Sequence, residues 1–140
     1  MAGVSTYVFL PGTTEEAFEF YRSVFGTEYE GGGPMRFSDA PDNAGMSEEQ
    51  AQSVMHVGLP ILGGHLLMGT DSPDVTMGDN VTIMLNPDTR DEADDLFAKL
   101  SDGGSNIQPM ADMFWGDYWG SFTDRFGIGW QVDVAGEPQG

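Results

Sequence analysis

The stretch Thr13-Thr14-Glu15-Glu16-Ala17-Phe18-Glu19-Phe20-Tyr21 decides the fold, because it returns 76 positions later as Thr89-Arg90-Asp91-Glu92-Ala93-Asp94-Asp95-Leu96-Phe97. In both copies a threonine precedes a glutamate by three residues, the spacing of a helix capping box. Each copy follows a short apolar stretch, at 7–10 and 83–85. A second repeat, 63 positions apart, relates Gly64-His65-Leu66-Leu67-Met68 to Gly127-Ile128-Gly129-Trp130-Gln131. The chain therefore repeats one plan of a strand, a helix and further strands.

The repeat predicts two βαβββ modules. The first combines a helix at 13–25 with strands at 7–10, 27–29, 35–38, 53–59 and 65–70. The second combines a helix from 89 to about 103 with strands at 81–85, 107–110, 118–123 and 129–134. Neither module buries its sheet alone, so we expect an α+β fold in which both form a curved mixed sheet around a central cleft, with the helices outside.

This fold predicts a single domain over 1–140, with module 1 at about 1–71, a linker at 72–80 and module 2 at 81–136. The segment 39–52 lacks a clear periodicity, although Ser47 could cap one helical turn. It is either a surface loop or a lid over the cleft.

Composition limits the function. There are 23 acidic residues against five basic ones, a net charge of −18, and binding nucleic acid would require a basic surface. The acids are scattered, which indicates adaptation to a salt-rich cytoplasm, where salt screens their repulsion; an acidic patch that docks basic partners is the alternative. No apolar run is long enough to span a membrane. The lack of cysteine and of a signal peptide favours a cytoplasmic protein.

Several segments resemble a known family. The helix Ala17-Phe18-Glu19-Phe20-Tyr21, the strand Val54-Met55-His56, and the segments Leu67-Met68-Gly69-Thr70-Asp71, Asn86-Pro87-Asp88, Phe114-Trp115-Gly116 and Thr123-Asp124-Arg125-Phe126-Gly127-Ile128 occur in order over nearly the whole chain. They resemble the PhnB-like branch of the vicinal oxygen chelate superfamily, which includes glyoxalase I, extradiol dioxygenases and bleomycin- or fosfomycin-resistance proteins. The resemblance implies a cleft that binds a small molecule, and a homodimer. Some members of the branch are named after glyoxalases or a ubiquinone methyltransferase, but those names do not define a reaction.

Catalytic members of this superfamily hold a divalent metal through His and Glu on the first and last strands of each module. The repeat places the corresponding positions here at Thr6, Thr82, Met68 and Gln131. Hydroxyl, thioether and amide groups bind such metals weakly compared with imidazole and carboxylate. We therefore predict that the protein holds no metal or other cofactor, with a divalent metal as the alternative.

The remaining candidates are a histidine and an aromatic segment. His56 could act as a general acid or base, or be a half-buried strand residue; His65 is expected to be structural. Asp112 and Asp117 could take a proton or cap turns. The expected ligand contacts, which could instead fill the core or an interface, are Arg36, Met68, Trp115, Tyr118, Trp119 and Gln131.

These residues predict a protein that binds a small planar or anionic molecule without a metal. Two alternatives stay open: a metal-dependent lyase or dioxygenase of the glyoxalase type, and a resistance-type protein that sequesters a toxic compound. Whether the protein is an enzyme stays open as well.

Overall fold

The computed structural model describes residues 2–41 and 45–136 and divides the chain into two compact units, 1–76 and 77–140. The division falls inside the predicted linker. We describe each unit by itself. Across the described residues, no helix has the length and apolar character needed to cross a membrane.

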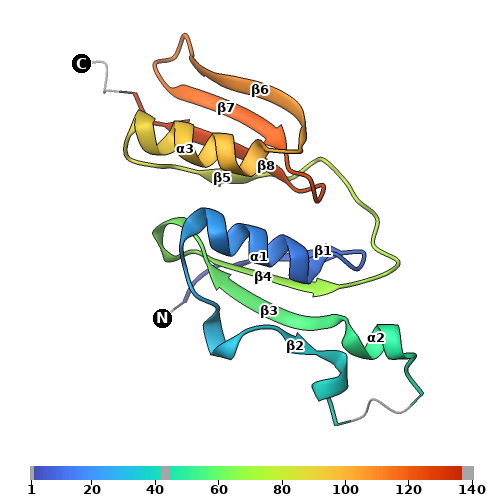
Figure 1. Ribbon diagram of the computed structural model, residues 1–140. Helices are drawn as coiled ribbons and strands as arrows, with labels where there is room; N and C mark the ends of the chain where they lie inside the picture. Colours follow the sequence, from blue (N-terminus) through green and yellow to red (C-terminus); the bar gives the residue numbers. More distant parts are fainter. Residues whose placement is uncertain (1, 42–44, 137–140) are drawn as a thin grey trace. The chain divides into compact units, whose positions relative to one another are not determined.

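Unit 1 is a four-stranded mixed sheet covered on one face by a helix (Figure 1). It contains β1 (Thr6–Leu10), α1 (Thr14–Phe25), β2 (Met35–Arg36), α2 (Glu48–Gln52), β3 (Val54–Pro60) and β4 (Leu66–Asp71), with short 3₁₀ turns at Glu30–Gly32, Phe37–Asp39 and Leu62–Gly64. The strand order is β1-β4-β3-β2, in which β1 and β4 are parallel and the other pairs antiparallel.

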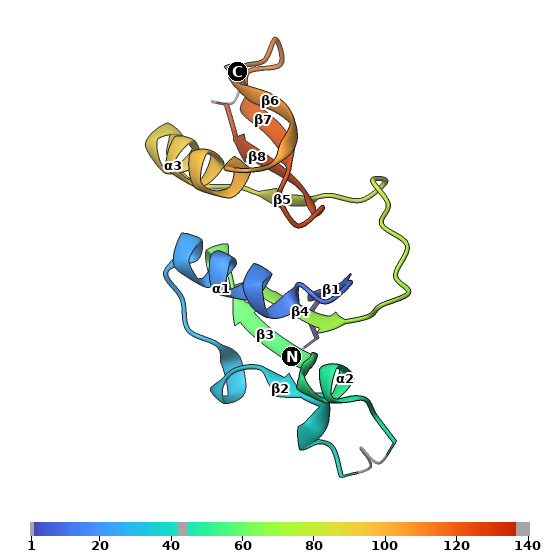
Figure 2. The same cartoon turned by 45° about the vertical axis from the view of Figure 1, so that its right-hand side comes forward.

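Unit 2 repeats this plan with β5 (Ile83–Leu85), α3 (Arg90–Ser101), β6 (Ser105–Asp112), β7 (Tyr118–Thr123) and β8 (Gly129–Val134) (Figure 2). Its order, β5-β8-β7-β6, is the order of unit 1, again with a parallel first pair. The predicted α+β class and the paired modules are confirmed. Each sheet is open rather than closed into a barrel.

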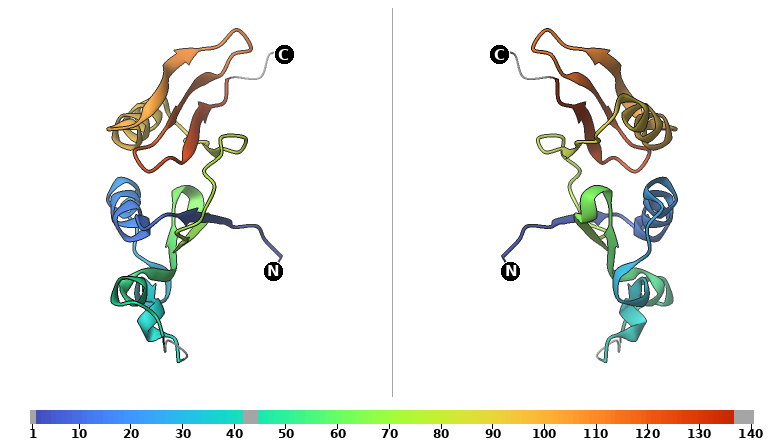
Figure 3. Two further views of the ribbon diagram at one scale, coloured as in Figure 1. Left: turned by 90° about the vertical axis from the view of Figure 1, so that its right-hand side faces the viewer. Right: turned by 90° about the vertical axis from the view of Figure 1, so that its left-hand side faces the viewer.

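The long helix of each unit buries its apolar side against one face of the sheet (Figure 3). Ala93, Leu96, Phe97 and Leu100 of α3 are buried. In α1 the rings of Phe18 and Tyr21 are fully buried, whereas that of Phe20 is half-buried. We call the opposite face, which points away from the unit's own long helix, the distal face.

Two local predictions differ in outcome. Thr89 caps α3, since its side chain accepts a hydrogen bond from the Glu92 backbone N–H at 3.1 Å. Thr13 makes no such bond at the start of α1. There the Asp71 carboxylate accepts the hydrogen bond of the Thr14 N–H at 3.0 Å, so a residue from the end of β4 satisfies the helix terminus.

The segment before β3 also differs from its prediction. No strand forms at 27–29, and β2 ends at Arg36, where a 3₁₀ turn replaces the rest of the predicted strand. Ser47 does cap a single helical turn, α2, by accepting a hydrogen bond from the Gln50 N–H. Residues 42–44 of the predicted loop or lid lie outside the described residues.

Candidate functional site

The distal face of unit 1 carries a hydrogen-bonded tyrosine and histidine. Tyr7 of β1 lies beside Met68 of β4, because the two are register partners in parallel strands. The Tyr7 hydroxyl is 3.2 Å from Nδ1 of His56, which projects from β3 on the same face. Phe9, two residues along β1, packs its ring 5.4 Å from that of Tyr7. The face thus combines aromatic rings, a thioether and one titratable imidazole.

The distal face of unit 2 carries a polar chain instead. The Trp119 indole of β7 donates a hydrogen bond to Gln131 Oε1 of β8 at 2.8 Å. Gln131 Nε2 in turn donates to the Thr82 hydroxyl at 2.8 Å. Trp119 occupies the position that His56 has in unit 1, since the strand pairs β3–β4 and β7–β8 have the same register at an offset of 63.

Thr6 is not on the distal face, contrary to the sequence prediction. Its register partner is Leu67, which is fully buried on the helix side, and its hydroxyl is hydrogen-bonded to His65 Nε2 at 2.8 Å. Val8 and Leu85 are equivalent strand positions, since they pair with the equivalent residues Gly69 and Val132, and they are 77 positions apart, whereas the helices begin 76 apart. Unit 2 therefore has one residue fewer between strand and helix, which shifts the strand alternation, so Tyr7 takes the distal position that we assigned to Thr6. His65 is structural, as predicted.

The predicted aromatic segment is divided between two faces. Tyr118 lies on the helix side with the buried Phe122, because the two residues are four positions apart along β7 and side chains an even number of positions apart share a face. Its hydroxyl donates to Asp94 of α3 at 2.6 Å, and the Arg90 guanidinium lies over its ring at 4.5 Å. Arg90 also pairs with Asp112. Tyr118 and Asp112 thus tie α3 to its sheet, and they are not on the face that carries Trp119.

Two aspartates of unit 2, Asp117 and Asp133, are hydrogen-bonded to each other through their side chains. Asp133 pairs with Trp119 across β7 and β8 and is 9% exposed. Burial raises the pKa of Asp133, and its hydrogen bond with Asp117 raises it further. The backbone N–H of Gly136, 3.0 Å from Asp117 Oδ1, lowers the pKa of Asp117, and hydrogen bonds from Asp133 and Trp115 add to this effect. The pKa values of the two carboxyl groups are thereby shifted in opposite directions, that of Asp133 upward and that of Asp117 downward.

Trp115 and Arg36 each have other contacts. Trp115 lies in the turn between β6 and β7, where its ring packs edge-on against Phe114 at 5.0 Å. Arg36 of β2 forms an ion pair with Glu15 of α1 at 2.6 Å and donates to the Gln52 carbonyl at 2.8 Å. Its guanidinium therefore serves to join α1 to the sheet edge.

Tyr7, Phe9 and Asp133 are distal-face residues that sequence reasoning did not propose for the site. The structure places Tyr7 and Phe9 there because Leu10 is fully buried on the helix side and successive strand residues alternate between faces. The sequence of 7–10 does not identify these faces, since all four residues are apolar or aromatic. Asp133 had no local signal either, because its burial depends on Trp119 and Asp117 from elsewhere in the chain.

Comparison with known proteins identifies the family to which this chain belongs. The family model described as 3-demethylubiquinone-9 3-methyltransferase matches residues 2–133. The crystal structure of PA1353 from Pseudomonas aeruginosa is 32% identical, with a TM-score of 0.82 over 96% of this chain and 98% of that one. The PhnB protein from Bacillus cereus is 24% identical, with a TM-score of 0.76 over 96% and 100% of the two chains. The chain belongs to the PhnB-like family.

The PhnB-like fold also matches more distant members of the vicinal oxygen chelate superfamily. A glyoxylase/bleomycin resistance protein/dioxygenase domain from Frankia is 11% identical, with a TM-score of 0.66 over 99% of this chain and 96% of that one. At this identity the likeness shows the fold alone. The resemblance inferred from sequence is confirmed.

The distal faces of the PhnB-like chain do not offer the superfamily's metal ligands. The first and last strands place Tyr7 beside Met68 on the distal face of unit 1, and Met84 beside Gln131 on that of unit 2, where the Thr82 hydroxyl also contacts Gln131. A phenol, a thioether, a hydroxyl and an amide are poor ligands for a divalent metal. Within 2–41 and 45–136, no three or more His, Asp or Glu side chains are grouped so that they could hold an ion. The residues present therefore do not fit the metal that the superfamily implies.

Proposed function

We propose that the protein binds a small planar molecule on the distal face of unit 1 and uses no divalent metal to do so. The hydrogen-bonded pair of Tyr7 and His56 carries this proposal, with Phe9 and Met68 beside it. Phe9 and Tyr7 are 51% and 41% exposed, which is unusual for large apolar rings. Flat aromatic groups and a polarizable thioether suit a flat ligand, and the phenol and imidazole supply polar contacts at its edge.

The charges support a planar ligand rather than an anionic one. All five basic side chains of the sequence lie in ion pairs: Arg22 with Glu19 and Glu28, Arg36 with Glu15, Arg90 with Asp112, Lys99 with Asp95, and Arg125 with Asp102. An anionic group would have to break one of these pairs and approach a protein of net charge −18.

Tyr7 and His56 also determine how the site could act on a bound ligand. If the Tyr7 hydroxyl donates to His56 Nδ1, the imidazole carries its proton on Nε2, where it can donate to a ligand carbonyl. A protonated imidazole would instead favour a ligand oxyanion that forms during a reaction. Both of these roles require the His56 imidazole. Binding that only sequesters the ligand would depend mainly on the aromatic rings of Tyr7 and Phe9.

Binding of 1,4-naphthoquinone, followed by backbone amide shifts in NMR, tests the binding site. We expect saturable shifts on β1, β3 and β4, and a weakening of about threefold in Tyr7→Phe and His56→Gln. The matched control is His65→Gln, which changes the chain's other histidine on the helix side. Equal weakening in both histidine variants, or shifts confined to other parts of the chain, would contradict the proposed site.

Metal analysis tests the other half of the proposal. Protein purified without a chelator should contain less than stoichiometric zinc, nickel, manganese or iron. A stoichiometric metal would favour the glyoxalase-type lyase or dioxygenase instead. Turnover of a bound compound that is lost in His56→Ala would identify an enzyme, and binding without turnover would identify sequestration.

A further inference from the structure

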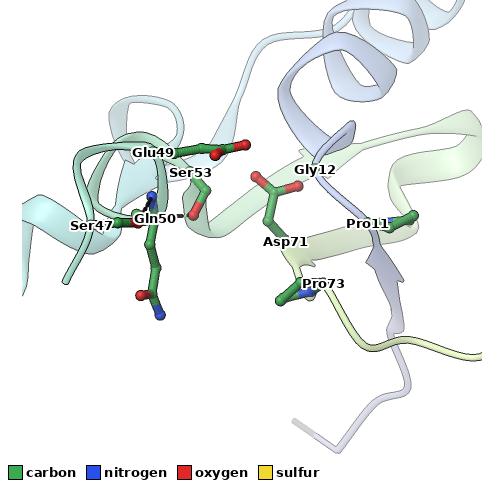
Figure 4. A pocket seen from close by; sticks show the side chains of 8 residues that line it. All are labelled: Pro11, Gly12, Ser47, Glu49, Gln50, Ser53, Asp71 and Pro73. Carbon is green, nitrogen blue, oxygen red and sulfur yellow. Dashed lines mark hydrogen bonds between the residues drawn. The ribbon is translucent and has the colours of Figure 1, made fainter.

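A cavity of about 480 Å³ in unit 1 lies apart from the distal face (Figure 4). Its walls are the turn at Pro11 and Gly12, the helix α2 with Ser53 after it, and the end of β4 with Pro73 beyond. This volume is within the range of sites for small organic ligands. Nothing in the proposed function uses this cavity.

Asp71 places the cavity on the helix side of the sheet. Its register partner Leu10 is fully buried, and the next residue on that face, Gly69, contacts Phe18 of α1. The Asp71 carboxylate accepts hydrogen bonds from the Thr14 N–H through Oδ1 and from the Val54 N–H through Oδ2, at 3.0 and 2.8 Å. These two bonds hold the starts of α1 and β3 at the cavity wall, and each oxygen retains a second lone pair.

The α2 wall adds hydroxyl groups and a second carboxylate. The Ser47 hydroxyl accepts a hydrogen bond from the Gln50 N–H at 3.1 Å, which leaves its own proton to donate. The Ser53 hydroxyl donates to the Gln50 carbonyl at 2.7 Å, which leaves its oxygen to accept. In Figure 4 the Glu49 side chain extends from α2 on the side of the Asp71 carboxylate.

The charge of this lining selects the ligand. The described residues around the cavity include the carboxylates of Glu49 and Asp71 and no cationic side chain. All five Lys and Arg side chains form ion pairs with acids that do not line the cavity, and of these cations Arg36 also lies near enough to Asp71 to interact with its charge. We propose that this cavity binds a small organic ammonium ion, with the charged group toward Glu49 and Asp71 and an apolar body against Pro11 and Pro73.

A bare metal ion fits this cavity less well than an organic cation. The cavity is much larger than an ion, and Glu49 and Asp71 are two acids where a metal site requires at least three ligands. An ammonium group needs only hydrogen-bond acceptors, which the two carboxylates and the Ser53 oxygen supply.

Titration of the full chain with benzylamine at pH 7 and 50 mM salt, followed by amide shifts in NMR, tests the proposal. Benzyl alcohol and benzoate serve as the neutral and anionic matches. We expect saturable shifts at Gly12, Ser47, Gln50 and Ser53 with benzylamine, and binding at least about tenfold weaker for the other two compounds. Comparable binding of benzoate or benzyl alcohol would overturn the proposal.

Two variants of the same helix separate this site from general attraction to an acidic surface. Glu49→Gln should weaken benzylamine binding about threefold, because Glu49 is exposed and its charge is partly screened. Glu48→Gln removes the same charge from the neighbouring position, which does not line the cavity, and should leave the affinity unchanged. Equal effects of the two variants, or shifts spread over other acidic residues, would overturn the proposal. Because these amides are not those of the distal face, failure here leaves the naphthoquinone result unaffected.

Discussion

The two units share a strand order but differ in what they place on their distal faces. Unit 1 presents Tyr7 and His56, whereas unit 2 presents a chain from Trp119 through Gln131 to Thr82 in which each bond is well formed. The helix sides are more alike, since both bury a long apolar helix stripe. Packing therefore constrains one face of the repeat, and the other face has been free to acquire different chemistry.

The cores themselves show how one fold accommodates two sets of side chains. Leu67 and Trp130 occupy equivalent positions on β4 and β8, and both are fully buried. The larger Trp130 also donates its indole N–H to Asp124 at 2.8 Å, and that carboxylate accepts from the Phe126 and Ile128 N–H groups as well. Unit 2 thus combines a larger core residue with a hydrogen-bonded turn that closes the β7–β8 hairpin.

The largest expected effect tests this core comparison. Trp130→Ala should lower the free energy of unfolding by about 4 kcal/mol, and Leu67→Ala by about 3 kcal/mol, since each leaves a cavity. Trp130→Ala also leaves Asp124 without one of its donors. Urea denaturation measures both, and Phe114→Ala, at a residue that is 95% exposed, is the control. A smaller loss of unfolding free energy in Trp130→Ala than in Leu67→Ala would contradict the added stability that we assign to the larger side chain and its hydrogen bond with Asp124.

The next effect concerns one glycine in each unit, Gly69 on β4 and Gly120 on β7. A Cβ at Gly69 would lie 2.6 Å from the Phe18 ring, and one at Gly120 would lie 2.8 Å from that of Phe97. The equivalent positions in the other unit carry valine, at Val132 and Val57. Each unit thus leaves space for its helix phenylalanine on a different strand.

Gly69→Ala and Gly120→Ala should each cost about 2 kcal/mol in the free energy of unfolding, because neither buried ring can move away freely. Thermal or urea denaturation measures this cost. Gly58→Ala is the matched control on β3, where the nearest atom would be 3.5 Å away, an ordinary contact. Neutral substitutions at both positions would show that the helices shift easily on their sheets.

A smaller effect follows from Asp133, whose equivalent in unit 1 is the uncharged Thr70. The pKa of Asp133 is raised in the folded state, so its stabilising contribution is present below the ordinary pKa and is lost as pH rises through the folded pKa. Asp133→Asn should therefore raise the melting temperature by a few degrees at pH 7. Its advantage should vanish below about pH 4, where aspartate is neutral in both states.

Melting curves at pH 7 and pH 3.5 measure this difference, with the exposed Asp74→Asn as the control. Asp117→Asn should have the opposite sign, because the pKa of Asp117 is lowered and its contribution is lost as pH falls. A lower melting temperature for Asp133→Asn at pH 7 would mean that the charged form is the one the fold stabilises.

The smallest effect concerns an ion pair that both units contain in opposite polarity. Unit 1 joins Glu15 of α1 to Arg36 at its sheet edge, and unit 2 joins Arg90 of α3 to Asp112. All four side chains are at least one-third exposed, so double-mutant cycles should give a coupling of about 0.5 kcal/mol in each unit. A coupling above about 2 kcal/mol in either would show that the pair is needed to hold its helix in place.

The sequence predicted the fold well because its signals are local and repeated. The helix stripe around Ala93 and Leu96, the glycine turn before β4, and the alternation of β7 and β8 each identify an element from a few neighbouring residues. Thr13 was less predictable, since the residue that satisfies its helix is Asp71, which is distant in the chain. The same limit applies to Asp133, whose pKa depends on contacts from other strands.

The site was harder to predict because successive side chains of a strand point to opposite faces of the sheet. An error of one position therefore assigns a residue to the wrong face. The helix offset of 76 is correct for the helices, yet the strands, matched by their register, are 77 positions apart. Carrying the helix offset into β1 therefore assigned Thr6 to the face that Tyr7 occupies. All four residues of 7–10 are apolar or aromatic, so the local sequence contains no polar alternation that would identify the face of each.

The position of Lys99 has a practical consequence. It carries the single side-chain amine of a chain that has no thiol, and it extends from the solvent side of α3, paired with Asp95 at 2.9 Å and half exposed. Amine-reactive coupling through this side chain to a dye or a biosensor chip would attach unit 2 by its helix. The surface of unit 2 that carries Trp119 and Gln131 would then remain turned away from the point of attachment at Lys99.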